Sequence, residues 1–350
     1  PFTVDLGVPE LEIRATYPGN TVKSYAVFGN GDFAVSQKLA LTGGVRYTND
    51  KKDFPDSTVV VTLILPDGTR VPQSTRSVAN TPSFSKTTWT AGVNYLLSDE
   101  KLAYGKVSTG YKAGGSEQGI TYLPENVTGY EAGLKTTLLN GQLTLNFAAF
   151  YNDYEDLQVA KTVNALTQVE NAATATTKGL EVEAAYASAN GFLINAGISF
   201  LNGEYGSYLD ATDPRNPLTD ADRANGLVGP DLSGNDLPDA PQIDAILSIE
   251  KDIQIGAGML TPRIDLHHRS RYWGTEFNDF GDYGVLGQKA YTRIDAGLAY
   301  AFGQGWSIRA WGNNLTDEEI QTFAVIGGNG SMIASYDNPR NYGLNVSYDF

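Results

Sequence analysis

The chain has no cysteine and only two methionines and two histidines, so little of it suits redox or metal chemistry. Without cysteine it forms no disulfide, no thiolate nucleophile and no cysteine-based metal site. Its formal net charge of −15 argues against a nucleic-acid partner, because phosphate binding needs clustered lysine and arginine. No apolar run approaches the ~18 residues that indicate a membrane-spanning helix. The opening residues 1–10 also lack the basic and apolar regions of a signal peptide.

Aromatic residues and glycine are abundant, with 20 tyrosines, 14 phenylalanines and 38 glycines among 350 residues, and the apolar residues recur with period two. At the C-terminus, Tyr342, Leu344, Val346, Tyr348 and Phe350 alternate with polar residues and glycine. Because successive strand residues point to opposite faces, such a segment has one apolar and one polar face. The same alternation recurs at 89–97, 143–151, 180–186 and 294–302, and helical spacing is not sustained anywhere. The fold class is therefore all-β and antiparallel.

Alternation alone fits a soluble sheet packed on a core and also a membrane barrel whose apolar face meets lipid. Three features favour the barrel. Segments such as 84–97 and 141–160 exceed the ~9–11 residues that cross a bilayer at a tilt. Short turns alternate with long connections, as they do in outer-membrane barrels. Aromatic residues also gather near the strand ends, where they suit the interfacial girdles.

The pattern predicts about thirteen membrane crossings. They lie near 21–36, 38–52, 83–97, 100–112, 126–139, 141–160, 171–188, 191–204, 240–252, 255–272, 288–302, 304–316 and 335–350. Bacterial barrels of one chain have even strand numbers with both ends in the periplasm, so an odd number predicts further strands before Pro1. Those strands belong to the same polypeptide or to another chain. Residues 58–72 resemble a hairpin turning at Asp67-Gly68, which we interpret as part of an extracellular loop.

Several segments, in order, resemble the barrel of TonB-dependent receptors. They include SYAVFGN (24–30), LTGGVRYTNDKKDF (41–54), YGKVSTGYKAGG (104–115), KGLEVEAAYA (178–187), LPDAPQ (237–242), RIDAGLAYAF (293–302), WGNNLTDEE (311–319) and PRNYGLNVSYDF (339–350). The likeness covers nearly the whole chain. It implies an antiparallel transmembrane β-barrel of the outer-membrane type with about 22 strands, of which residues 1–350 form the C-terminal part. On this interpretation the plug domain, the TonB-contacting segment and roughly the first nine strands are absent.

Two parts of the resemblance assign roles to residues. Asn313, Asn314 and Leu315 match a family box in which asparagine side chains fix the departing loop. Tyr348 and Phe350 match the terminal signal read by the outer-membrane assembly machinery, and the alternative for Phe350 is a simple interfacial anchor.

No catalytic motif is present: the sequence has no G-x-S-x-G, no P-loop and no H-E-x-x-H, so we expect no enzyme and no cofactor. His267 and His268 are adjacent on a predicted strand, point to opposite faces and are poorly placed to share a metal ion. The aspartate-rich loop 208–239 has the oxygen ligands that calcium prefers, but a solvated acidic loop is the favoured interpretation. We therefore expect no metal site.

The strand phase predicts charged residues that face the barrel lumen: Arg46, Glu131, Lys135, Glu181, Glu183, Arg263, Asp265, Arg293, Asp295 and Arg309. The favoured interpretation is that they pair with each other and with a plug, and the alternative is that some contact a passing solute. Loop aromatics are candidates for first ligand capture, although loop packing is favoured for them: Tyr111, Tyr122, Trp273, Phe277 and Phe280.

The leading hypothesis is an outer-membrane receptor that takes up a bulky, scarce nutrient when TonB acts on the plug. A ferric siderophore is the commonest substrate of the family, and oligosaccharides and cobalamin-like compounds are others. The expected partners are outer-membrane lipid, TonB–ExbB–ExbD through the missing plug, the barrel assembly machinery and the small-molecule ligand. A barrel module completed by a second chain is the alternative, and a passive porin is disfavoured. The acidic composition mildly disfavours a highly anionic ligand.

Overall fold

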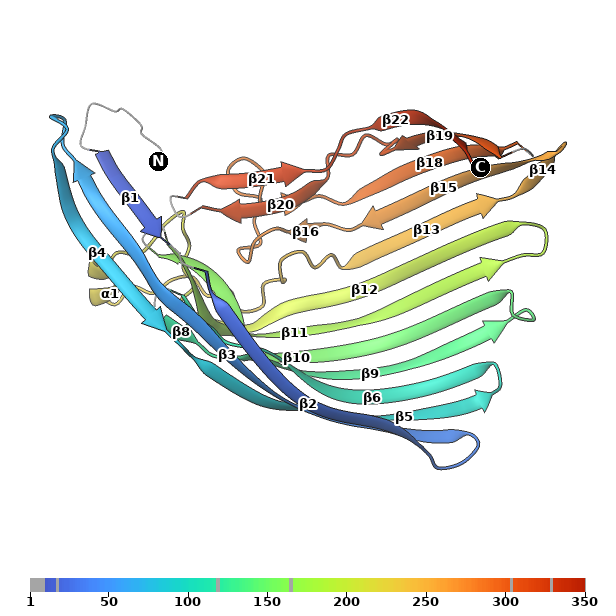
Figure 1. Cartoon of the computed structure of the whole chain (residues 1–350), viewed down its shortest axis with the longest axis horizontal. Coiled ribbons are helices and arrows are strands. Elements are labelled where there is room, and N and C mark those ends of the chain that lie inside the picture. Colours follow the sequence, from blue (N-terminus) through green and yellow to red (C-terminus); the bar gives the residue numbers. More distant parts are fainter. Residues whose placement is uncertain are drawn as a thin grey trace.

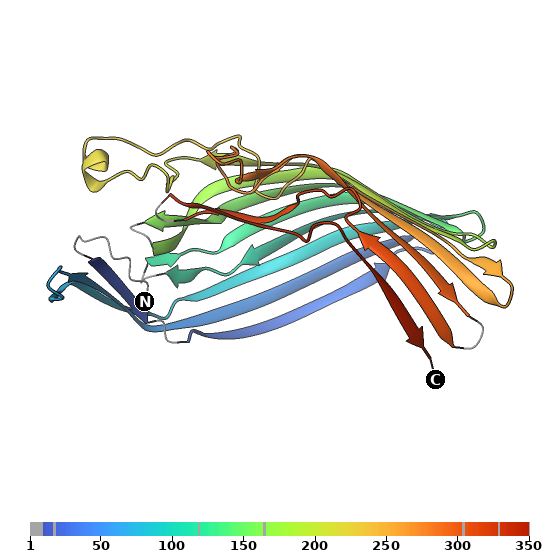
Figure 2. The same ribbon diagram turned by 90° about the horizontal axis from the view of Figure 1, so that it is seen from above.

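The computed structural model describes residues 10–16, 19–117, 120–163, 166–302, 305–327 and 330–349. It shows a wide antiparallel sheet that curves into a trough (Figures 1 and 2). The wall of this trough consists, in chain order, of β2 (Thr21–Ala34), β3 (Leu39–Ile64), β5 (Ser83–Ser98), β6 (Lys101–Lys112), β9 (Glu125–Leu138), β10 (Leu143–Val163), β11 (Leu166–Ala187), β12 (Phe192–Tyr208), β13 (Ile243–Lys251), β15 (Gly258–Arg269), β18 (Tyr291–Ala301), β19 (Trp306–Asn313) and β22 (Asn341–Tyr348).

These strands are the thirteen segments that the sequence predicts. Within the described residues the sheet has 16 strands, of which β1 (Glu10–Thr16), β4 (Arg70–Asn80) and β14 (Ile253–Ile255) lie off the wall. Each wall strand pairs antiparallel with its neighbour along the chain. Most observed limits lie within a few residues of the predicted ones, and the all-β antiparallel prediction is confirmed.

The predicted hairpin at 58–72 forms, but it is larger than expected. β3 runs on to Ile64, turns through 65–69 and pairs with β4, while β1 pairs with the other side of the same extension. Figure 1 shows this three-stranded sheet projecting beyond the wall. The predicted hairpin is therefore confirmed, and its backbone hydrogen bonds are satisfied in a ladder of its own.

The long connections also contain small ordered elements that the sequence pattern did not predict. They are β7 (Gly115–Glu117) with β8 (Ile120–Tyr122), β16 (Tyr272–Trp273) with β17 (Gly287–Gln288), β20 (Gln321–Ile326) with β21 (Met332–Tyr336), and helix α1 (Asp220–Ala224). Thr219 caps α1 through a capping box with Asp222. No helix in the described ranges is long and apolar enough to cross a membrane.

The strand register assigns each side chain to one of two faces. Residues directly opposite each other on neighbouring strands share a face, so Phe28, Arg46 and Thr88 lie together. We call this side the polar face, and the same register places on it Glu131, Glu181, Asp265 and Arg309. The opposite side, which we call the outer face, carries exposed apolar side chains, including Trp89, Phe147, Leu180, Leu298 and Leu344.

The outer face forms an apolar band whose height approaches the ~25 Å of outer-membrane barrels. On β10 it runs from Leu143 to Tyr151, about 27 Å along the strand and roughly 20 Å across the membrane at a usual tilt. Aromatic rows bound it: one row contains Tyr25, Tyr47, Tyr130 and Tyr151, and the other contains Tyr95, Tyr186, Trp306 and Tyr348. The rings of Tyr130 and Tyr151 lie 6.4 Å apart, and those of Trp306 and Tyr348 lie 4.9 Å apart. This surface is suited to lipid.

Buried apolar residues gather at the end of the wall that carries the long connections. One cluster joins Val159, Ala173, Ala175, Tyr205, Tyr208, Ala211 and Leu232, with Phe277 packed against it. The trough itself has no comparable apolar filling among the described residues, because its inner side is the polar face. The packed loops therefore form a cap at one end of a polar-lined wall.

Candidate functional site

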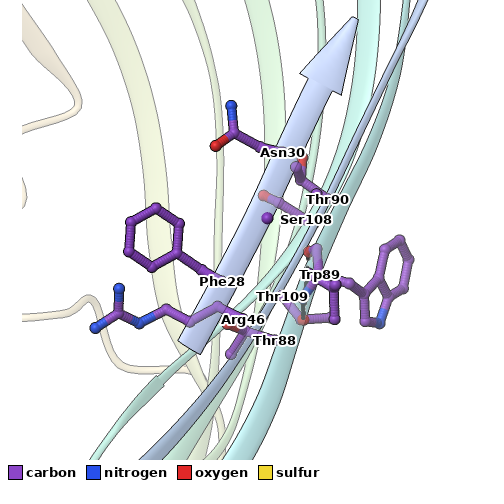
Figure 3. A pocket seen from close by; sticks show the side chains of 11 residues that line it. Phe28, Asn30, Arg46, Thr88, Trp89, Thr90, Ser108 and Thr109 are labelled. Carbon is purple, nitrogen blue, oxygen red and sulfur yellow. Dashed lines mark hydrogen bonds between the residues drawn. The ribbon is translucent and has the colours of Figure 1, made fainter. Parts of the chain in front are cut away.

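A pocket on the polar face contains the best-placed free cation among the predicted site residues. It has a volume of about 250 Å³ and is lined by β2, β3, β5 and β6. The guanidinium of Arg46 lies 5.5 Å from the centre of the Phe28 ring, and its Nε donates a hydrogen bond of 2.9 Å to Thr48 Oγ1. Figure 3 shows Phe28, Asn30 and Arg46 projecting to one side of the wall while Trp89 projects to the other. The pocket thus combines a cation, a ring and polar groups.

The chemistry of this pocket suits an oxygen-rich or anionic group. Asn30, Thr88, Thr90 and Ser108 add an amide and hydroxyls to its lining. In the described part of the chain no carboxylate lies within ion-pair distance of Arg46. A guanidinium presents several N–H donors in a planar fork that matches carboxylates and similar anions. Arg46 is therefore available to pair with an incoming group.

Tyr111 belongs to the same sector of the wall. Its hydroxyl donates a hydrogen bond to Asp50, and Lys52 Nζ donates one of 3.5 Å to the Ala113 carbonyl. Tyr111 lies in the predicted crossing 100–112, and β6 does continue to Lys112, so Tyr111 belongs to the wall and its grouping with the loop aromatics is wrong. Tyr111 consequently has a fixed position beside Asp50 at the strand end.

Glu131, Lys135, Glu181 and Glu183 form a second group on the polar face. Glu131 accepts a hydrogen bond of 2.7 Å from the Tyr104 hydroxyl and pairs with Lys106 Nζ at 2.9 Å. Lys135 Nζ lies 5.7 Å from the centre of the Tyr104 ring, and Asn146 Nδ2 donates to Glu183 at 3.4 Å. Most of these charges are thus engaged with neighbouring strands. Glu181 lies between them, opposite Ala148 and Ser199.

Four of the five remaining predicted charges pair along the wall. Arg263 Nη2 lies 2.8 Å from Asp265 and its Nη1 lies 3.6 Å from Glu250. Arg293 pairs with Asp295 at 2.9 Å and with Asp337 at 2.7 Å. Arg309 occupies the polar face between Ala299 and Asn345. The register places all ten lumen candidates on the polar face, and their contact with a solute stays a prediction.

A second pocket, of about 400 Å³, lies where the polar face meets the loop cap. It is lined by Asp239, His267, Arg269, Tyr272, Tyr291, Arg293, Ile320, Gln321, Thr322 and Asp337. His267 Nε2 lies 2.8 Å from Asp244 on the polar face, and His268 Nδ1 lies 2.9 Å from Thr292 on the outer face. The two histidines therefore point to opposite faces, as predicted. Within the described ranges no group of three metal-binding side chains was found.

The loop aromatics lie inside the cap. Trp273 is 9% exposed and its ring meets Phe280 edge-on at 4.9 Å. Phe277 packs under the Arg215 guanidinium at 4.9 Å and against the buried cluster of the cap. Arg215 itself pairs with Asp213 and Asp279, both at 2.8 Å, and so ties two loops together. These positions favour loop packing over first capture of a ligand.

Glu276, within this cap, is expected to destabilise the protein at neutral pH. Burial raises the pKa of its carboxyl, and a hydrogen bond from its own backbone N–H offsets this in part. A raised folded-state pKa means that the protonated form fits the fold better, so stability falls as pH rises from about 4 through the folded-state pKa. We expect Glu276→Gln to raise the free energy of unfolding by about 1 kcal/mol at pH 7.5.

Denaturant titrations at pH 7.5 and pH 4 test this expectation. The gain from Glu276→Gln should shrink at pH 4, where the wild-type carboxyl is protonated. The exposed Glu319→Gln is the control and should change stability little at either pH. A gain that is equal at both pH values would exclude ionisation of Glu276 as its cause.

Sequence reasoning missed several residues that the fold brings together. The register of four strands brings Arg46 together with Phe28, Thr88, Thr90 and Ser108. The sequence could have identified them only by aligning the alternation of these strands with that around Arg46. The second pocket also contains Asp239, Tyr272 and Gln321. They come from the long connections, where the sequence shows no alternation from which their positions could be predicted.

The chain resembles known proteins over most of its length. A protein-family model described as "TonB dependent receptor-like, beta-barrel" matches residues 2–315. The pesticin receptor of Yersinia pestis is 24% identical over 352 residues, covering 98% of this chain and 46% of the relative. The chain thus spans about half the length of the curated relatives it matches.

Solved structures show the same fold. The ferric yersiniabactin uptake receptor FyuA from Yersinia pestis superposes with a TM-score of 0.73 at 21% identity, covering 97% of this chain and 47% of that one. The siderophore receptor PiuA from Acinetobacter baumannii gives 0.72 at 18% identity, covering 94% and 43%.

Proposed function

Because the chain belongs to the TonB-dependent receptor-like β-barrel family, we propose that it forms part of an outer-membrane receptor for active uptake of a bulky, scarce nutrient. A ferric siderophore is the substrate class that we favour, since the similar proteins include a ferric yersiniabactin uptake receptor and a siderophore receptor. The family places the chain in the bacterial outer membrane, which agrees with its apolar outer face. Carbohydrate or cobalamin-type compounds are the other substrate classes to be tested.

The observation that supports this function best is the Arg46 pocket on the polar face. A free guanidinium beside an aromatic ring and several hydroxyls offers both charge and hydrogen bonds to an oxygen-rich chelate. The acidic composition of the whole chain disfavoured such a ligand, yet this sector of the wall presents a cation to the lumen. The second pocket, with Arg269 and Arg293, lies nearer the loop cap on the ligand's entry side.

The trough requires further strands to become a barrel. Among the described residues β2 pairs with β3 alone and β22 pairs with β19 alone, so two edges are open (Figure 2). Unpaired backbone groups facing hydrocarbon cost several kcal/mol each, so lipid does not tolerate such edges. We propose that residues 1–350 are the C-terminal portion of a barrel that surrounds a plug, and that TonB–ExbB–ExbD acts through that plug.

A barrel completed by a different chain is the alternative, and it rests on the same two open edges. The intact mass of the protein from outer membranes distinguishes a barrel made by one polypeptide from a barrel completed by a second chain. One polypeptide carrying the missing strands and a plug should have roughly twice the 37.7 kDa of this chain, as its relatives do. A mass near 37.7 kDa would favour a partner chain.

Arg46→Gln is expected to weaken ligand binding about tenfold, because a charge-assisted hydrogen bond contributes about 1.5–3 kcal/mol. The measurement is binding of ⁵⁵Fe-labelled ferric yersiniabactin and a panel of other ferric siderophores to cells that express the protein. Lys38→Gln, an equal charge change at a short turn on the opposite rim, is the control and should bind normally. If Arg46→Gln binds a ferric siderophore as tightly as the wild type does, Arg46 does not contact the ligand. If the wild type binds none of the ferric siderophores, the proposed substrate class is wrong.

A further inference from the structure

Two lysines face each other on the outer face, beside an open edge of the wall. Lys23 on β2 lies directly opposite Lys51 on β3, and both side chains are exposed. Directly opposed residues have Cβ atoms about 4.5–5.5 Å apart, and like charges at that spacing destabilise a sheet. The repulsion calls for a compensating group.

No such group is supplied by the described residues. No ion pair joins either ammonium to a carboxylate within the described ranges. The nearest carboxylate in register on this face is Asp53, opposite Thr21, and it already accepts a hydrogen bond of 3.1 Å from Thr81. Lys178 provides a contrast, because it lies on the outer face with Glu204 at 4.0 Å.

The position of the pair relative to the apolar band indicates what surrounds it. Tyr25 and Tyr47 belong to the aromatic row that also contains Tyr130 and Tyr151. They lie on the outer face of the same two strands, between the lysines and the apolar band. Beyond them the outer face becomes polar, with Asn49, Ser83 and Ser85 beside Lys51. This end of the strands leads into the long β3–β4 hairpin, whereas the opposite end closes in the short turn 35–38, so it is the extracellular end.

We propose that Lys23 and Lys51 bind a phosphate group of an outer-leaflet glycolipid, with the neighbouring hydroxyls and amide meeting its sugar. A phosphate between the two ammonium groups converts their repulsion into two charge-assisted contacts. The aromatic row below fixes the depth, since tyrosine rings lie at the level of lipid headgroups. This lipid site is separate from the polar face, so it is independent of the nutrient that the barrel transports.

Lipid binding tests the proposal directly. Purified protein in mild detergent is titrated with lipid A that carries both phosphates and with its dephosphorylated form, and bound lipid is counted by native mass spectrometry. Each lysine near an anionic surface contributes about 1 kcal/mol, so the double variant Lys23→Gln/Lys51→Gln should bind phosphorylated lipid about tenfold to thirtyfold more weakly. Lys178→Gln, on the outer face in the aromatic row opposite Tyr151 and already paired with Glu204, should bind nearly as the wild type does.

Two results of that titration would overturn the proposal: equal binding of both lipid forms by the wild type, or unchanged binding by the double variant. Inorganic phosphate provides a further arm. If phosphate alone, at the lipid's concentration, gives the same occupancy at these lysines, the site recognises a free anion and the assignment to lipid is wrong.

Thermal unfolding gives an independent test, because the difference in midpoint temperature between variant and wild type should change sign when phosphorylated lipid is present. In neutral detergent without phosphate the repulsion is uncompensated, so the single variant Lys51→Gln should have a higher midpoint than the wild type. In micelles containing phosphorylated lipid A the order should reverse, because the wild type gains the bound lipid. A variant that is more stable in both environments would contradict the proposal.

Discussion

Replacing Ala149 with arginine is expected to destabilise the protein by about 2–3 kcal/mol in a lipid bilayer. Ala149 lies on the outer face of β10, between Phe147 and Tyr151 and opposite Leu180. An arginine there places a guanidinium within the apolar band, between its middle at Phe147 and the aromatic row at Tyr151, where hydrocarbon provides no partner. The cost is largest at the bilayer centre and falls toward the interfaces.

Ala148→Arg is the matched control, since the two alanines are adjacent and differ in the face that they occupy. Ala148 lies on the polar face, opposite Gly133 and Glu181, so an arginine there meets water and a carboxylate. We expect Ala148→Arg to change stability by less than about 1 kcal/mol. Guanidinium titrations in phospholipid vesicles measure both variants. Equal losses would contradict the assignment of the two faces.

Asn314→Ala is expected to cost about 3 kcal/mol, through two separate effects. The Asn314 side chain is fully buried and donates to the carbonyls of Glu318 and Asn338, at 2.9 Å and 3.3 Å, while it accepts a bond of 2.9 Å from the Glu318 N–H. Alanine leaves all three backbone groups without this partner, at about 1 kcal/mol each. Asn314 also has a φ of +51°, which asparagine tolerates better than alanine does.

Asn313→Ala isolates the effect of the buried side chain. Asn313 makes a single side-chain bond, of 3.3 Å to Asn341, so its loss should cost less than about 1 kcal/mol. Thermal unfolding and limited proteolysis of the 314–340 connection measure both variants. We expect Asn314→Ala to be cleaved much faster in this connection, and equal behaviour of the two variants would show that Asn314 does not hold it.

The wall was predictable because period-two alternation is a local property of a strand with one apolar and one polar face. On β10 the alternation from Leu143 to Tyr151 gives both the strand and its phase, and the register with Leu180 and Tyr130 confirms it. The turn at Asn140-Gly141 follows from residues that accept positive φ. The prediction that asparagine fixes the 314–340 connection is also confirmed, by the bonds of Asn314.

The cap and the pockets were not predictable in the same way, because their contacts join residues far apart in the chain. Arg215 donates to Asp279 across 64 residues, and the Gln321 backbone N–H donates to Gln288 Oε1 across 33 residues. β3 extends past the membrane because β1 and β4 supply hydrogen bonds on both of its sides, which alternation alone does not reveal. The assembly signal stays a prediction: Tyr348 packs on Trp306 in the aromatic row with Tyr95 and Tyr186, and Phe350 lies outside the described residues.

The central claim is that one face of this wall contacts lipid while the other lines a watery lumen, and spin labelling tests it most directly. The chain has no cysteine, so single cysteines placed at each position from 143 to 154 on β10 can be labelled without background. Collision with oxygen reports lipid contact, and collision with a water-soluble nickel complex reports contact with water. We predict strict alternation, with oxygen access highest at Leu145, Phe147 and Ala149 and nickel access highest at Asn146, Ala148 and Phe150. Access without a period of two, or alternation in the opposite phase, would contradict the account.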